Sequence, residues 1–194
     1  MPLAILAYHS HHVVGPGYGE NDHVAFARDL DGLTDGHWRI VPLADLVRAH
    51  REGVSERLVA LTFDDGPVYD VEDVVHPDYG LQRGFANAMR AFAARRPGAQ
   101  PSLHATSFVI ASPEARFAME ASADPRYTWL APGSMGEAWW SPAIDSRLVA
   151  IANHSWDHLH PTNAQQREIY DWLMASGENV LTGDSFFHLN ALGP

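Results

Sequence analysis

The chain has 194 residues, of which 46% are hydrophobic and 19% charged, and its formal net charge is -11. This balance is typical of one globular domain and excludes a disordered chain, while the absence of cysteine excludes disulfides, thiolate metal ligands and cysteine nucleophiles. All 13 basic residues are arginine, and the acidic excess argues against nucleic acid as a partner because phosphate binding requires a basic surface.

The first half of the chain alternates short apolar runs with helical patterns. Residues 3–8 form an apolar run that predicts a buried strand, and a glycine-rich loop separates it from a helix that begins near residues 21–22. A second strand is expected at 38–41, and Pro42 begins the next helix. The apolar run 58–63 then predicts another buried strand.

The second half continues this alternation after a long loop predicted over residues 64–83. Its predicted elements are, in chain order, a helix around 85–92, a strand at 104–110, a short helix from Pro113, a strand at 148–152 and a helix at 165–175. Residues 124–142, rich in proline, glycine and tryptophan, are expected to form an ordered surface loop. Strands separated by helices predict an α/β fold with a parallel sheet covered on both faces.

Two adjacent carboxylates follow one of the predicted strands, in the sequence TFDDGP of residues 62–67. In α/β folds the carboxyl ends of the strands are where ligands bind. Because adjacent residues leaving a strand point in different directions, one of Asp64 and Asp65 can bind a metal ion while the other stays free as a base. The alternative is a solvated turn, since such sequences are common in turns.

Two histidines follow a second predicted strand, in the sequence NHSWDH of residues 153–158. His154 and His158 are four residues apart, the spacing of one helical turn, which predicts that both imidazoles lie on one side. Taken alone, the pair also fits two surface histidines in a loop. Combined with a carboxylate from residues 62–67 at the same rim, it predicts a three-ligand metal site with open positions for water and substrate.

Together these two motifs resemble the first and second motifs of the polysaccharide deacetylase family, which is also described as the NodB homology domain or carbohydrate esterase family 4. The pair Tyr8-His9, residues 105–110 and the pair His160-Pro161 also resemble that family. The resemblance covers about residues 1–161 and implies a distorted (β/α) barrel.

The resemblance implies a role for each residue of the two motifs. Asp64 would be the general base, and Asp65, His154 and His158 would hold a divalent ion. Zinc is the ion expected for a mixed imidazole and carboxylate site, and cobalt, nickel or iron also suit these ligands. The implied activity is the removal of N-acetyl or O-acetyl groups from a carbohydrate such as an N-acetylglucosamine polymer.

The chain departs from the family after His158. The family's Arg-Pro-Tyr-type segment, which shapes the oxyanion site, has no match there, and its Leu-x-His segment, which supplies a general acid, has only a weak match at His188. His188 is therefore the candidate acid. Residues 162–194 are interpreted as a divergent tail that continues the domain of residues 1–161, and the barrel is expected to be incomplete at its C-terminus.

Three further residues are candidates for supporting roles. His9, which follows the first strand, and Trp156, whose ring offers a flat face to a sugar, are candidate substrate contacts, whereas Asp70 is expected either in a turn or in support of the site. The first residues lack the pattern of a signal peptide, and no apolar run is long enough to span a membrane. The default expectation is therefore a cytoplasmic protein without membrane insertion, or an extracellular or periplasmic one if the chain is a fragment.

Two other functions remain open at this point. The first is a related metal-dependent amidase that acts on a small non-sugar amide. The second is a protein that binds metal or carbohydrate but is catalytically impaired, because the acid and oxyanion segments of the family have no clear counterpart in the tail.

Overall fold

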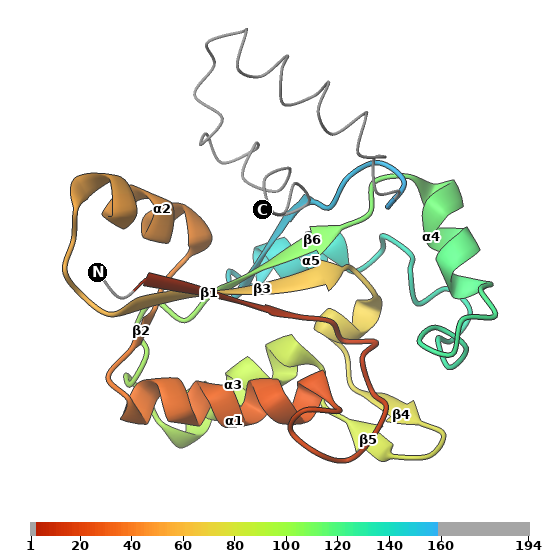
Figure 1. The fold of residues 1–194 in the computed structure, drawn as a ribbon, viewed down its shortest axis with the longest axis horizontal. Helices are drawn as coiled ribbons and strands as arrows, with labels where there is room; N and C mark the ends of the chain where they lie inside the picture. Colours follow the sequence, from red (N-terminus) through yellow and green to blue (C-terminus); the bar gives the residue numbers. More distant parts are fainter. Residues whose placement is uncertain (1–2, 159–194) are drawn as a thin grey trace, which may run out of the picture.

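The computed structural model describes residues 3–158, in which a sheet of five strands is packed against helices (Figure 1). The strands are β1 (Leu3–Tyr8), β2 (Arg39–Ile40), β3 (Leu58–Asp65), β6 (Ala105–Val109) and β7 (Val149–Asn153). Their order is β1-β3-β6-β7, with β2 also paired to β3, and every pairing is parallel. The predicted parallel α/β class is confirmed. Within residues 3–158, β1 and β7 form the two ends of this strand order.

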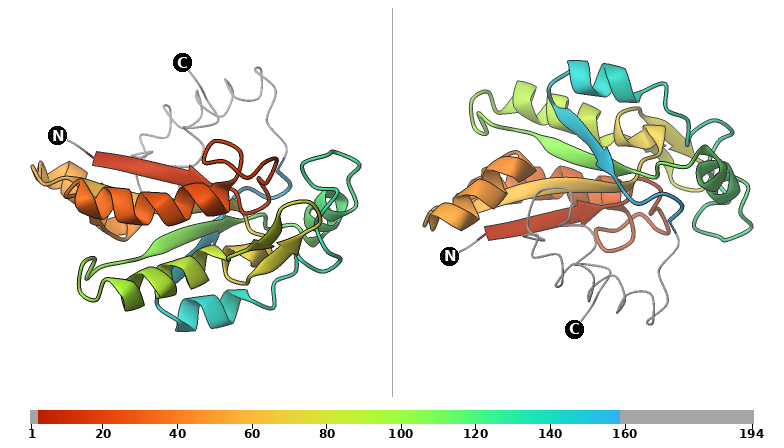
Figure 2. Two further views of the ribbon diagram at one scale, coloured as in Figure 1. Left: turned by 90° about the horizontal axis from the view of Figure 1, so that it is seen from below. Right: turned by 90° about the horizontal axis from the view of Figure 1, so that it is seen from above.

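Helices cover the sheet and connect its strands. They are α1 (Asp22–Asp35), α2 (Leu43–Glu52), α3 (Phe85–Arg95), α4 (Pro113–Glu120) and α5 (Trp140–Asp145). Figure 2 shows α1 and α3 side by side on one face of the sheet. Helix α1 begins where its cap predicts, because the Asn21 side chain accepts hydrogen bonds from the backbone N–H groups of His23 and Val24. None of the helices within residues 3–158 is long and apolar enough to cross a membrane.

An aromatic core lies between the sheet and helices α1 and α3. Phe26 of α1, Phe63 of β3 and Phe85 of α3 are fully buried, and their ring centroids lie 4.6 to 5.3 Å apart. Full burial of one such side chain stabilises a fold by about 1.5–3 kcal/mol. Since Phe63 directly precedes Asp64, this packing fixes the end of β3 from which the two carboxylates project.

The prediction that residues 64–83 form a long loop is wrong in part. It contains a 3-10 turn, η1 (Val68–Asp70), and an antiparallel hairpin of β4 (Val74–His76) and β5 (Gly80–Gln82). Gly80 has a φ of 69°, the left-handed region that glycine adopts without strain. Strands of three residues are too short for the alternation of side chains to be visible in the sequence.

The surface loop predicted over residues 124–142 is also wrong in part. Its C-terminal end begins α5, and Tyr127, Leu130 and Met135 form a second buried cluster with residues of η1, α4 and the segment after β6. Trp139, in the same segment, is buried in the main core. The buried apolar residues of this segment were not predicted, because they are spaced too widely among turn residues to give a periodic pattern.

Candidate metal-binding active site

The two carboxylates separate where β3 ends. Asp65 and Gly66 both have left-handed backbone angles, with φ of 74° and 78°. Aspartate tolerates this region better than most residues, and Gly66 is required because a Cβ atom there would lie 2.6 Å from Cγ1 of Val109. The side chain of Asp65 is 3% exposed and that of Asp64 22%, so the two acids occupy different environments.

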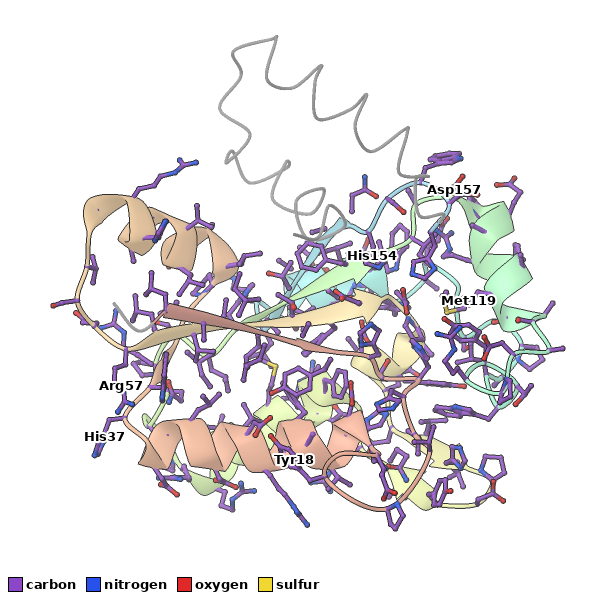
Figure 3. The ribbon with its side chains drawn as sticks, viewed as in Figure 1. Tyr18, His37, Arg57, Met119, His154 and Asp157 are labelled. Carbon is purple, nitrogen blue, oxygen red and sulfur yellow. The ribbon has the colours of Figure 1, made fainter. Side chains whose placement is uncertain are left out.

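The two histidines follow β7 on the same rim of the sheet. Figure 3 shows His154 at this rim, whereas Arg57, which precedes β3, lies at the opposite one. The backbone N–H of His154 donates to the Val109 carbonyl of β6 at 2.9 Å. The segment from His154 to His158 is not a helical turn, although both imidazoles lie on one side as their spacing predicts. Ser155 and His158 have φ of 70° and 57°, so a tight turn brings the imidazoles together.

This turn is fastened to the neighbouring segment. The Ser155 carbonyl accepts a hydrogen bond from the Ala111 N–H, and the Trp156 carbonyl accepts one from the Ser112 N–H. The His158 N–H donates to Ser155 Oγ at 3.1 Å. Backbone hydrogen bonds therefore hold both histidines against β6 and the start of α4.

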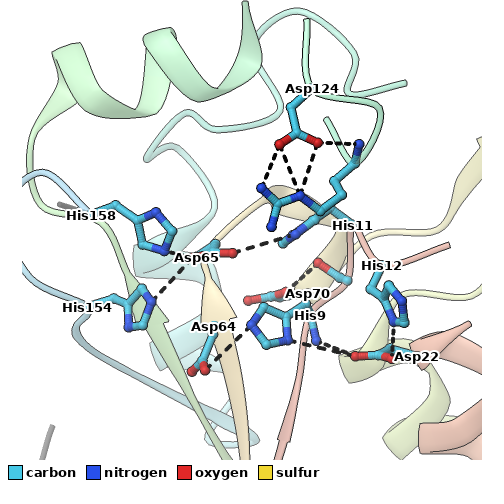
Figure 4. Close-up of polar contacts among 12 residues, drawn as sticks. His9, His11, His12, Asp22, Asp64, Asp65, Asp70, Asp124, His154 and His158 are labelled. Atoms are coloured by element: carbon cyan, nitrogen blue, oxygen red, sulfur yellow. Dashed lines mark hydrogen bonds and ion pairs between the residues drawn. The ribbon is translucent and has the colours of Figure 1, made fainter. Parts of the chain in front are cut away.

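Three potential ligand atoms converge at the rim. Nε2 of His154 and Nε2 of His158 lie 3.3 and 3.0 Å from Oδ1 of Asp65 (Figure 4). Within residues 3–158, Oδ1 of Asp65 is buried without a hydrogen-bond partner. Donor atoms bound about 2.1 Å from a tetrahedral ion are roughly 3.4 Å apart, so this spacing and the unpartnered oxygen fit a divalent cation. The three residues are the metal-ligand set expected from the sequence.

The electrostatics of these residues favour a bound cation. Burial alone would raise the pKa of Asp65, but the imidazoles of His154 and His158 outweigh it and hold the pKa below its usual range. Burial would likewise lower the pKa of His154, and the Asp65 carboxylate reverses this and raises it. The carboxylate is thus kept ionised among the ring nitrogens, where a cation interacts favourably with all three.

His11 lies behind Asp65, and the sequence indicated only that, as a residue after the first strand, it could border this rim. Its Nε2 is 3.7 Å from Oδ2 of Asp65, and its side chain is 6% exposed. Burial lowers the pKa of His11 to about 4, so the ring is neutral at neutral pH and leaves the Asp65 charge available to a cation. The available signal was its position just beyond the end of β1, whose carboxyl end meets this rim.

Asp64 contacts His9 and is not a member of the ligand cluster. Nε2 of His9 lies 3.8 Å from Oδ2 of Asp64, and Nδ1 of the same ring lies 4.0 Å from Oδ2 of Asp22. The Asp22 carboxylate also accepts the backbone N–H of His9 at 2.7 Å and contacts Nδ1 of His12 at 2.8 Å. Burial raises the pKa of Asp64 and outweighs the opposing effect of His154 and His9. Sequence reasoning described Asp22 only as the start of a helix.

Asp70 is fully buried below this rim. Its two carboxyl oxygens accept hydrogen bonds from Ser10 Oγ and Ser107 Oγ, both at 2.6 Å. Burial raises the pKa of Asp70 from its ordinary value of 3.8 to about 8, although both serines oppose the shift. Asp70 therefore supports the segment after β1 from inside, rather than serving as a turn residue alone.

This raised pKa predicts a dependence of stability on pH. Between its unfolded and folded pKa values Asp70 binds a proton only in the folded state, so its contribution to stability is full below about pH 4 and is lost as pH rises to about 8. The slope is about 1.4 kcal/mol per pH unit. In the metal-free protein, Asp70→Asn should abolish this part of the slope, measured by urea unfolding at several pH values. Asp145→Asn, at an exposed position, is the control; equal slopes in wild type and Asp70→Asn would show that Asp70 is ionised.

Two of the predicted site residues, Trp156 and His188, are not among the described groups that converge at the rim. Trp156 projects from the turn between the two histidines and is 66% exposed. His188, His160 and the boundary at residues 161–162 lie outside the described residues, as does the helix predicted at 165–175.

Characterised proteins match the chain over a short segment. No family model matches the chain. Over 38 residues, 20% of the chain, it is 71% identical to mycofactocin maturase MftC of Mycolicibacterium smegmatis and 66% identical to the Mycobacterium tuberculosis protein of the same name. The chain spans about a tenth of the length of these curated relatives.

Several solved structures of deacetylases align with most of the chain at low similarity. The Streptococcus pyogenes deacetylase PplD in complex with acetate has 16% identity and a TM-score of 0.46, over 90% of this chain and 69% of that one. IcaB from Ammonifex degensii has 18% identity and a TM-score of 0.47, over 97% and 70%. These similarities are too low to assign an activity, which therefore rests on the geometry of the chain's own site.

Proposed function

We propose that this protein is a metal-dependent hydrolase that removes acetyl groups from a carbohydrate, in particular from the nitrogen of an amino sugar. The observation that carries the proposal is the convergence of Asp65, His154 and His158 beside a second carboxylate, Asp64, that stands outside the ligand set. A divalent ion held there, with zinc the first choice and cobalt, nickel or iron as alternatives, would polarise the acetyl carbonyl and lower the pKa of a water molecule.

Asp64 is the proposed general base. It directly precedes the ligand Asp65 at the end of β3 and interacts electrostatically with His154, so its carboxylate is close to the metal position without being needed as a ligand. Burial raises its pKa from the usual carboxylate range, which brings its basicity closer to what proton transfer at neutral pH requires. Asp64 accepts the proton of the attacking water as the new carbon–oxygen bond forms.

His9 is the proposed proton donor to the leaving amine. Its Nε2 faces Asp64 across 3.8 Å, while Asp22 lies behind the ring and binds the His9 backbone. An imidazolium in this position can protonate the nitrogen as the carbon–nitrogen bond breaks. His188 stays a second candidate for this role from the sequence, and its position lies outside the described residues.

The charge and surface of the chain bear on the substrate. With a net charge of -11 and no lysine, the protein favours a neutral or cationic partner over an anionic polymer. The exposed ring of Trp156, between the two histidine ligands in sequence, offers a flat apolar face for a sugar. Both features support an acetylated amino sugar, whose product amine is cationic.

Acetate release tests this proposal. The full chain, loaded with zinc or cobalt, should release acetate from chitooligosaccharides, and a chelator should stop the reaction. Turnover of small acetamides or formamides alone would favour the amidase, and binding of metal without turnover of any substrate would favour the impaired binding protein. Acetate release that persists after complete removal of the metal would contradict the proposal.

Replacement of His9 should separate two classes of substrate. In His9→Ala we expect amide hydrolysis to fall on the order of 10² to 10⁴-fold, because an amine must be protonated to leave. Hydrolysis of an activated aryl acetate should be nearly unchanged, since an aryloxide leaves without a proton. The measurement is kcat for both substrates, with His37→Ala, an exposed residue at the other end of the sheet, as the control. If amide hydrolysis is lost selectively in His188→Ala and not in His9→Ala, His188 is the proton donor.

A further inference from the structure

We infer that His23 is a positioning residue for the proposed deacetylation: its buried imidazole ties the rim loop, residues 9–13, to the start of α3 and thereby holds His9 over Asp64. The inference rests on the proposed function and extends it to a residue outside the metal and proton-transfer machinery. His23 is 5% exposed and lies in the first turn of α1.

The imidazole of His23 forms a bridge between two backbone carbonyl groups. Nε2 lies 2.7 Å from the carbonyl oxygen of Ser10, and Nδ1 lies 2.8 Å from that of Arg83. A neutral imidazole donates to one of these oxygens and an imidazolium to both. The ring also packs against Phe85 with a centroid separation of 4.9 Å, so its orientation is fixed from the side as well.

The Arg83 end of the bridge belongs to the rigid part of the fold. Gly84, the next residue, caps α3, and its N–H donates to Asp73. Gln82, the preceding residue, accepts a hydrogen bond from the Asn21 side chain at 2.8 Å. Since Phe85 is fully buried in the core, the Arg83 carbonyl is a fixed point against which His23 can hold another segment.

The Ser10 end of the bridge belongs to the rim loop. Ser10 is fully buried, and the residue before it is His9, so the peptide unit between them carries any shift of Ser10 directly to the proposed proton donor. Asp22, immediately before His23, binds the His9 N–H and the His12 ring. The first turn of α1 thus fastens the rim loop at three positions, His9, Ser10 and His12.

Other contacts also hold the rim loop in place, and they limit the loss of rate expected when His23 is replaced. Ser10 Oγ donates to Asp70, and Trp129 Nε1 donates to the His11 carbonyl at 3.1 Å. Loss of the bridge should therefore displace His9 without unfolding the rim loop. A misplacement of about 1 Å costs roughly 100-fold in rate when a reacting group must be aligned, which sets the upper end of the expected loss.

The test compares two substrates in graded variants of the metal-loaded protein. In His23→Leu, which donates to neither carbonyl, we expect kcat for an N-acetyl amide to fall about 10- to 100-fold, with metal content and aryl acetate hydrolysis retained. In His23→Gln, whose amide donates to one carbonyl, the loss should be smaller. His104→Gln is the matched control, because His104 is half-buried and precedes β6 at the opposite rim. Hydrogen exchange in residues 9–13 should accelerate in His23→Leu and not in the control.

The outcomes distinguish this inference from the proposed function. A parallel loss of amide and ester hydrolysis in both His23 variants would show a structural role only and overturn the inference, as would unchanged hydrogen exchange in the rim loop. If His23→Leu fails to fold, the comparison of His23→Gln with wild type decides on the same criteria. If the wild type hydrolyses neither substrate, the proposed function fails, and hydrogen exchange still decides whether His23 holds the rim loop.

Discussion

Replacing both histidine ligands with alanine is expected to reduce the bound divalent ion from about one per chain to background. Without the two imidazoles, the single carboxylate of Asp65 is a weak monodentate site. Metal analysis of the purified chain and of the His154→Ala, His158→Ala double variant measures this directly. The double variant His37→Ala, His50→Ala, which removes two exposed histidines, is the matched control. Undiminished metal in the first double variant would rule out the proposed ligand set.

The same ligands make metal affinity depend on pH. The imidazoles must be neutral to bind, so affinity should fall as pH drops through the histidine range near about 6.5. Because the Asp65 carboxylate raises the pKa of His154, proton competition at that ligand should begin above the ordinary range. Asp65 itself, whose pKa is held low by the imidazoles, should stay ionised throughout this titration. Titration of metal binding between pH 5 and pH 8 would show the loss toward acid.

Replacing the proposed base is expected to remove activity while leaving the metal in place. Asp64→Asn preserves shape and cannot accept the proton of the attacking water, so acetate release should fall on the order of 10² to 10⁴-fold. Asp65→Asn should instead lose metal and activity together, because it removes an anionic ligand. The two variants change adjacent residues in the same way and thus control for each other. If Asp64→Asn strips the metal and Asp65→Asn retains it, the two roles are reversed.

Much of the sheet could be predicted because its strands are continuous apolar runs. Leu3–Tyr8 matches its prediction, and β3 was predicted up to Phe63. The two acids that complete β3 were assigned to a loop, since charged residues break an apolar run, although pairing with β6 continues through Asp65. The hairpin of residues 74–82 and the packed segment of residues 124–142 were missed for lack of any periodic pattern.

The candidate site shows a similar division. The sequence pointed to Asp64, Asp65 and the two histidines because they occur in compact motifs after apolar strands. The spacing of four between His154 and His158 correctly predicts that both rings lie on one side, but it fits a helix as well as a tight turn. The tight turn could not be predicted because backbone angles at Ser155 are not visible in the sequence. The contacts of Asp70 with Ser10 and of His23 with Arg83 join residues about 60 positions apart, so no local pattern reveals them.

The position of β6 has a consequence for the order in which the protein folds. Strand β3, which ends at Asp65, and strand β7, which precedes His154, do not pair with each other within residues 3–158; each pairs with β6. Asp65 and His154 can therefore meet only after both long-range pairings have formed, and such non-local pairings are slow steps in folding. The rate of tight metal binding during refolding would thus report the rate at which the sheet is completed. A folding intermediate that lacks β7 would not bind the metal tightly.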